Sequence, residues 1–154
     1  MKIAYFQYDK LVLKIYVSSD KISKIDFIDT YFEAEEDEFI RKIKSQLLAY
    51  CKGELKEFDL DLLVEGTAFQ KKVWEEMQKI PYGKTRTYGE LAEKVGNPKG
   101  ARAVGMACNK NKIPVIIPCH RVVGKNGKLT GFAGGLDIKE LLLKIEGEKA
   151  NVNK

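Results

Sequence analysis

A thiol lies directly beside the only histidine of this 154-residue sequence, in the run Pro118-Cys119-His120-Arg121. Thiolate is the reactive form of cysteine, and a neighbouring imidazole and positive charge favour its formation from a thiol whose free pKa is about 8.5. The alternative is a structural cysteine in a hydrophobic core, because free cysteines are among the most buried residues. Taken alone, the run leaves the nucleophile and the core cysteine both open.

The residues on either side of this run predict elements that hold it in place. The apolar residues before Cys119 predict a strand-like segment with the thiol at its end. Downstream, a helix is predicted over 137–146, with an apolar stripe that packs on the core. The members of that stripe are Ile138, Leu141, Leu142 and Ile145.

Three helices are predicted upstream of the thiol. Thr67 and Thr87 are each followed three residues later by Gln or Glu, which is a capping-box pattern at a helix N-terminus. A third helix is predicted over 101–109, after a tight connection at 96–100. Two short helices joined by a turn match the helix-turn-helix plan, in which the second helix reads DNA.

The first part of the chain predicts a small antiparallel sheet and one helix. Apolar runs at 3–6, 11–17 and 22–28 alternate with polar breaks, and apolar residues from 39 to 51 recur at helical spacing. The segment 55–66 lacks periodicity, so we predict a domain boundary near Gly66. The expected domains are a strand-rich domain at 1–66 and a second domain at 67–154.

Charge is divided unevenly between these two predicted domains. Residues 1–66 contain 10 Lys and Arg against 14 Asp and Glu, whereas 67–154 contain 17 against 8. A basic domain favours an anionic partner, nucleic acid first, although a solvated lysine-rich face is the alternative. Three cysteines without a close pair, no secretion-like start and no long apolar run predict a cytoplasmic protein without membrane contact.

The predicted helix 101–109 combines small residues with one long basic side chain. Ala101, Ala103 and Gly105 leave little bulk, and Arg102 projects from the first turn. Such a helix can enter a narrow groove and probe between bases. The alternative is close helix packing, with Arg102 as a surface charge.

From about Thr67 to Gly147 the sequence resembles the O6-alkylguanine-DNA alkyltransferase family, which transfers alkyl groups from guanine to one of its own cysteines. The resemblance rests on motifs in matching order and spacing. These are Pro118-Cys119-His120-Arg121-Val122-Val123, Ile80-Pro81-Tyr82-Gly83-Lys84-Thr85, Thr87-Tyr88, Ala101-Arg102-Ala103-Val104-Gly105, Asn111, Gly134-Gly135-Leu136 and Glu146-Gly147. It implies an α/β (α+β) fold, with a ribonuclease-H-like N-terminal domain and a mostly helical C-terminal domain.

The resemblance implies a role for each matching residue of the reaction centre. Cys119 is the alkyl acceptor, His120 removes its proton through a water, and Glu146 orients the imidazole. Asn111 is the hinge between the reading helix and the active-site segment. Tyr88 rotates the 3′ phosphate and later protonates N3 of the departing guanine.

Further residues are implied in DNA binding and in the substrate pocket. Arg102 fills the space of the extruded nucleotide, since an O6-alkyl group inside a stacked duplex cannot reach a buried sulfur. The other implied DNA-binding residues are Thr87, Tyr88, Ala101, Ala103, Gly105 and Arg121. The implied pocket residues are Pro114, Val122, Phe132, Ala133 and Gly134, where Phe132-Ala133 replaces a Tyr-Ser pair of many relatives and bears on substrate range.

These inferences predict a single-turnover repair protein, a methylated-DNA–protein-cysteine methyltransferase that acts as a monomer on double-stranded DNA carrying O6-alkylguanine. O4-alkylthymine is a second candidate substrate. No cofactor and no metal are expected, because His120 is the only histidine and is used elsewhere. We expect Cys108 to be a core residue. A DNA-binding module without activity and a thioester-forming cysteine hydrolase are the alternatives, against which Cys119 and the lack of acyl-substrate features argue.

Overall fold

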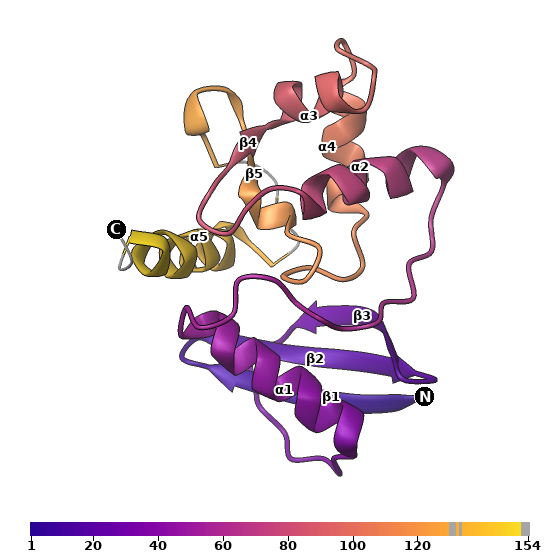
Figure 1. The fold of residues 1–154 in the computed structure, drawn as a ribbon, viewed down its shortest axis with the longest axis vertical. Helices are drawn as coiled ribbons and strands as arrows, with labels where there is room; N and C mark the ends of the chain where they lie inside the picture. Colours follow the sequence, from indigo (N-terminus) through magenta and orange to yellow (C-terminus); the bar gives the residue numbers. More distant parts are fainter. Residues whose placement is uncertain (130–131, 133, 152–154) are drawn as a thin grey trace. The chain divides into compact units, whose positions relative to one another are not determined.

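The computed structural model describes residues 1–129, 132 and 134–151, the last four of them by backbone alone. By their internal contacts, the residues form two compact units, Met1–Val64 and Glu65–Lys154. Three consecutive strands followed by one helix make up the first unit, and helices dominate the second (Figure 1).

The first unit is a three-stranded antiparallel sheet covered by one helix. Strands β1 (Lys2–Tyr8), β2 (Leu11–Ser18) and β3 (Lys21–Phe27) are joined by tight hairpins and pair in the order β1-β2-β3. Helix α1 (Glu38–Cys51) buries its apolar stripe, Cys51 included. The helix begins at Asp37, whose carboxylate accepts a hydrogen bond from the Ile40 amide.

The segment that we expected to be a linker is partly attached to this sheet. The amide of Ile22 donates to the carbonyl of Asp61 at 2.9 Å, and the amide of Leu63 donates to the carbonyl of Ile22 at 2.9 Å. These bonds form a short parallel bridge between Ile22 and Leu62. The lack of hydrophobic periodicity in this segment therefore did not indicate a free linker. The edge of β3 offers backbone donors and acceptors, and the segment hydrogen-bonds to them.

Three helices of the second unit have the predicted starts. Helix α2 (Ala68–Gln78) and helix α3 (Tyr88–Lys94) each begin with a complete capping box, at Thr67 and Thr87. Helix α4 (Ala101–Asn109) follows α3 after a short connection. The indole of Trp74 in α2 donates to the carbonyl of Ala107 at 2.9 Å, which ties α4 to α2.

The segment before the thiol is not a strand. Residues 112–117 form consecutive bends and turns, and one turn of 3-10 helix, η1 (Cys119–Arg121), follows Pro118. Two prolines, Pro114 and Pro118, remove backbone donors that a strand would need. Pairing begins only at β5 (Val122–Val123), which lies parallel to β4 (Arg86–Thr87).

The second unit ends with helix α5 (Leu136–Asn151), preceded by the short 3-10 turn η2 (Lys125–Gly127). Its buried face differs from the predicted stripe. Ile138 and Leu141 are only half-buried, whereas Lys139, Leu142 and Glu146 are fully buried. The buried face of α5 therefore includes two of its own charged residues, Lys139 and Glu146, which an apolar stripe could not indicate.

The predicted α/β class is confirmed, with an N-terminal sheet and helix and a mostly helical C-terminal unit. The ribonuclease-H-like topology stays an implication of the resemblance. Among residues 1–129, 132 and 134–151, none of the helices combines the length and the apolar character needed to cross a bilayer.

Candidate active site

Cys119 is the first residue of the η1 turn and keeps partial exposure. Its amide donates to the carbonyl of Ile117 at 2.8 Å, which fixes the backbone at the thiol. Burial raises the pKa of Cys119 to about 11, and a hydrogen bond from Asn111 and the positive charge of Lys139 oppose that rise. The resting site therefore holds a thiol, and ionisation of that thiol near neutral pH requires a base.

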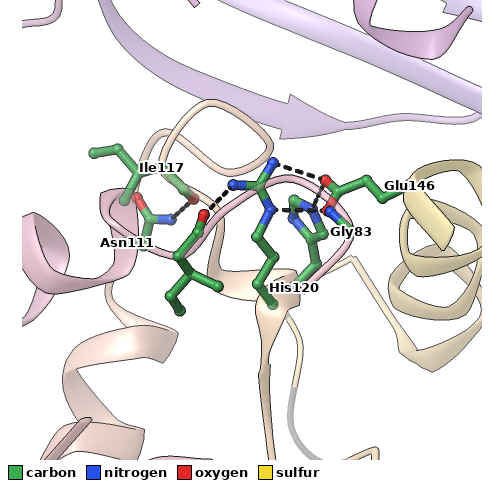
Figure 2. Close-up of polar contacts among 7 residues, drawn as sticks. Gly83, Asn111, Ile117, His120 and Glu146 are labelled. Carbon is green, nitrogen blue, oxygen red and sulfur yellow. Dashed lines mark hydrogen bonds and ion pairs between the residues drawn. The ribbon is translucent and has the colours of Figure 1, made fainter. Parts of the chain in front are cut away.

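Asn111 links the end of α4 to the thiol. Its side-chain Nδ2 donates to the carbonyl of Ile117 at 2.8 Å (Figure 2). Its Oδ1 accepts from the amide of Ile113 at 3.0 Å. Between these two bonds, Val115 has φ of 74°, a left-handed conformation that is costly for a β-branched residue. The buried amide thus holds a strained turn immediately before Cys119.

His120 and Glu146 form a buried pair. Nε2 of His120 lies 2.5 Å from Oε2 of Glu146, and the two side chains are 0% and 1% exposed (Figure 2). The carboxylate also accepts from the backbone amide of Gly83 at 3.3 Å. Residues far apart in the sequence therefore fix the imidazole beside the thiol.

Arg121 is buried and bound to the same carboxylate. Its Nε lies 2.8 Å from Oε1 of Glu146, its Nη2 lies 3.1 Å from Oε2, and its Nη1 donates to the carbonyl of Ile80 at 2.6 Å. A guanidinium with all three nitrogens bound in the protein interior cannot contact a DNA phosphate. This buried position does not favour the expected contact of Arg121 with DNA, and its charge instead neutralises Glu146.

Opposing effects act on the pKa of Glu146. Burial alone would raise it, but the adjacent His120 and Arg121 outweigh burial and lower the pKa to about 2. Glu146 is thus a carboxylate at any pH near neutrality. A permanent carboxylate can orient the imidazole and stabilise a positive charge on it.

Two further ionisable residues surround the thiol. Cys108 is buried, and its sulfur lies 3.5 Å from Sδ of Met77; burial raises its pKa to about 12. Lys139 is 0% exposed and donates from Nζ to the carbonyl of Val122 at 2.6 Å. The sequence interpretation missed Lys139. Its spacing of three and seven residues from Leu142 and Glu146, on one helical face, is the signal that could have found it.

The predicted DNA-binding residues gather on α4 and at the start of α3. Arg102 and Ala103 are exposed, Ala101 and Gly105 are half-buried, and Gly105 faces the ring of Tyr88. Thr87 is the N-cap of α3 and is half-buried, like Tyr88. The expectation that α4 offers little side-chain bulk needs correction, because the helix also presents a large apolar side chain, Met106, which is 62% exposed.

The comparisons with known proteins agree with this arrangement. Residues 68–148 match the family described as 6-O-methylguanine DNA methyltransferase, DNA binding domain. A curated methylated-DNA–protein-cysteine methyltransferase from Methanosarcina acetivorans is 60% identical over 124 residues, which are 80% of this chain and 78% of the relative. This chain belongs to the O6-alkylguanine-DNA alkyltransferase family. The predicted family and enzyme class are confirmed.

Solved alkyltransferase structures share the fold of the chain. The OGT protein of Mycobacterium tuberculosis, determined in complex with DNA, is 38% identical, with a TM-score of 0.85 over 96% of this chain and 93% of that one. The O6-methylguanine-DNA methyltransferase of the archaeon Pyrococcus kodakaraensis is 25% identical, with a TM-score of 0.61 over 94% of this chain and 98% of that one. Similarity therefore extends over both units of the alkyltransferase.

The residues expected to line the alkyltransferase pocket are only partly described. Pro114 and Val122 are buried, and Phe132 and Gly134 are half-buried. Ala133 lies outside the described residues. Within those residues, no cluster of three or more His, Cys, Asp or Glu side chains is arranged to hold a metal ion.

Proposed function

We propose that this alkyltransferase removes an alkyl group from O6 of guanine in double-stranded DNA and keeps it on Sγ of Cys119. The supporting observation is the buried His120–Glu146 pair, at 2.5 Å, immediately after a partly exposed thiol. In the proposed step the thiol proton passes to the imidazole through a water. The sulfur then forms a bond to the alkyl carbon, and the bond from that carbon to O6 breaks.

The charge balance of Glu146 supports His120 as the base. Because the guanidinium of Arg121 binds both carboxylate oxygens, the carboxylate is neutralised without a charge on the imidazole. A neutral imidazole then donates its Nε2 proton to Glu146 and keeps a lone pair on the buried Nδ1. The proton from Cys119 goes to Nδ1, and the resulting imidazolium is stabilised by Glu146.

We propose that Tyr88 supplies the proton that the leaving guanine needs. Loss of the alkyl group leaves negative charge on the base, and protonation at N3 by a phenol neutralises it. Tyr88 begins α3 and is half-buried, with its ring next to Gly105 of α4. This position joins the first helix of the proposed helix-turn-helix to the reading helix, and suits a contact with the 3′ phosphate.

Nucleotide flipping is the second part of the proposal. Helix α4 reads DNA through Arg102, Ala103 and Gly105, and Arg102 occupies the stack after the damaged nucleotide leaves it. Thr87, Tyr88 and Ala101 complete the contacts at the ends of α3 and α4. We therefore assign DNA binding and transfer to residues 67–154, in a protein that works as a cytoplasmic monomer.

The flipped base is proposed to sit against Pro114, Val122, Phe132, Ala133 and Gly134. Phe132 can pack on an alkyl group, and backbone amides near Ala133 can donate to O6. The same contacts are available to O4-alkylthymine, which we propose as a weaker substrate. A thioether on a saturated carbon offers water no carbonyl to attack, so the alkylated protein is expected to be inactive.

Labelling experiments on the three cysteines test the acceptor assignment. The wild-type protein, Cys119→Ala, Cys51→Ala and Cys108→Ala are incubated with duplex DNA containing O6-methylguanine and mapped by peptide mass. Label is expected at Cys119 in every protein except Cys119→Ala, which should still bind DNA. Full labelling of Cys119→Ala would show that another residue is the acceptor.

A further inference from the structure

A lysine is buried beside the reaction centre. Lys139, in α5, is 0% exposed, although lysine is among the residues least often buried completely. Its ammonium group donates to the carbonyl of Val122 at 2.6 Å and lies 6.0 Å from the centroid of the Tyr88 ring. Both neighbours belong to the proposed site, so a charge that is costly to bury has been placed where the reaction occurs.

The charge of Lys139 interacts with the two thiols of the second unit. Burial lowers the pKa of Lys139, and interaction with Cys119 and Cys108 opposes that effect. In return, the charge of Lys139 lowers the pKa of both thiols. Cys108 is packed against Met77 in the core and is less readily ionised, so the negative charge that Lys139 can stabilise forms on Cys119.

The other charged groups near the thiol do not supply this stabilisation. Arg121 and Glu146 neutralise one another through two hydrogen bonds, and His120 is bound to the same carboxylate. Lys139 also lies near the ring of Tyr88, and Cys119 interacts with the uncharged amide of Asn111. Lys139 is thus the cation whose charge acts on the thiol in the described part of this site.

The hydrogen bond to Val122 gives Lys139 a second effect. Val122 follows the η1 turn directly, begins β5 and is one of the expected pocket residues. A bond from α5 to this carbonyl fixes the distance between the helix and the turn that carries the thiol. Removal of the ammonium group would therefore change both the electrostatics and the position of Cys119.

We propose that Lys139 is a positioning residue for alkyl transfer, whose buried ammonium group stabilises the thiolate of Cys119 and holds the η1 turn against α5 through the Val122 carbonyl. The proposal rests on Cys119 as the acceptor. In the transfer step the proton of Cys119 leaves to His120 as before. Lys139 keeps its own proton and lowers the free energy of the sulfur anion from which the new bond to carbon forms.

The test measures the reactivity of the thiol without DNA. Iodoacetamide, an uncharged reagent, is reacted with the protein from pH 6 to 11, and the rate at Cys119 is followed by peptide mass. Lys139→Met removes the charge and the donor, whereas Lys139→Gln removes the charge but keeps a donor. Lys144→Met, an exposed lysine on the same helix, is the matched control.

We expect both Lys139 variants to raise the apparent pKa of Cys119 by about one unit or more, which makes the reaction about tenfold slower below that pKa. Lys144→Met should behave as wild type. An unchanged pH–rate profile in Lys139→Gln would overturn the proposal, because a purely structural lysine would leave the ionisation of the thiol alone. Since this readout needs no alkylated DNA, its failure is distinct from failure of labelling at Cys119.

A measurement on the wild-type chain keeps the proposal testable if the variants do not fold. The pKa of Lys139 is followed by NMR of its ε-carbon, with Cys119 as a free thiol and after carbamidomethylation. Loss of the ionisable sulfur should lower the pKa of Lys139, because a thiolate no longer stabilises the ammonium ion. An identical titration in the two forms would contradict the proposed coupling.

Discussion

The guanidinium of Arg121 holds both carboxylate oxygens of Glu146, with Nε 2.8 Å from Oε1 and Nη2 3.1 Å from Oε2. This two-point pair is buried and is completed by the hydrogen bond to the carbonyl of Ile80. The arginine of the Pro-Cys-His-Arg run therefore acts on the orientation of the histidine, through Glu146, and its side chain is buried.

Replacement of Arg121 should destabilise the protein more than it weakens DNA binding. Arg121→Met leaves a buried carboxylate with fewer partners, which costs about 3 kcal/mol or more in the free energy of unfolding. Arg121→Lys keeps the charge but loses the fork, so an intermediate loss is expected. Denaturant unfolding and DNA titration measure the two effects. Loss of DNA affinity at unchanged stability would restore Arg121 as a DNA contact.

The lowered pKa of Glu146 predicts acid sensitivity. The folded state binds this proton more weakly than the unfolded state, because the pKa falls from 4.5 to about 2. The carboxylate therefore stabilises the fold above pH 4.5, and that stability is lost as pH falls toward 2. Glu146→Gln should be less stable than wild type at pH 7 but should lose less stability than wild type on acidification, as measured by denaturant unfolding at each pH. Glu140→Gln, exposed on the same helix, should keep the wild-type slope.

Arg102 should matter for duplex DNA and not for the free base. If its side chain fills the vacated stack, Arg102→Ala slows repair of O6-methylguanine in duplex DNA by about tenfold or more, because extrusion is no longer compensated. Reaction with free O6-alkylguanine should hardly change. Second-order rate constants on both substrates provide the measurement, and equal losses on the two would assign Arg102 to the fold or the pocket.

Tyr88→Phe is the matched comparison for that experiment. Phenylalanine keeps the ring that lies near Lys139 and Gly105 and removes only the hydroxyl. Because the proposed proton donor is lost, the rate should fall on the free base as well as on the duplex. A loss on the duplex alone would leave Tyr88 with a phosphate contact and without a role in the chemistry.

Local patterns in the sequence predicted the elements well, because they depend on neighbours along the chain. The capping boxes at Thr67 and Thr87 are complete, and the helix predicted over 101–109 has those bounds. The thiol and the histidine were found for the same reason, since they are adjacent. The strand predicted before Cys119 was wrong. Prolines and a hydrogen bond from the Asn111 side chain hold this segment in turns, in place of the strand pairing that its apolar residues suggested.

The environments of charged residues could not be predicted in this way. Arg121 was expected to bind DNA and is buried, because it pairs with Glu146 and Ile80, which lie far away in the sequence. Lys139 was missed since burial of an ammonium group depends on a carbonyl and an aromatic ring from other elements. Met106 was overlooked because small neighbours dominated the interpretation of α4. These positions are decided by tertiary contacts, which a single sequence does not reveal.

The stoichiometry of transfer tests the central claim most directly. The protein is mixed with a tenfold excess of duplex DNA containing O6-methylguanine, without reductant or partner protein, and methyl transfer is followed by intact mass and by loss of the lesion. One methyl group per chain is expected, on Cys119, after which the reaction stops with most of the DNA unrepaired. Continued loss of lesions beyond one equivalent would contradict irreversible transfer to the thiol and favour a cysteine enzyme that turns over.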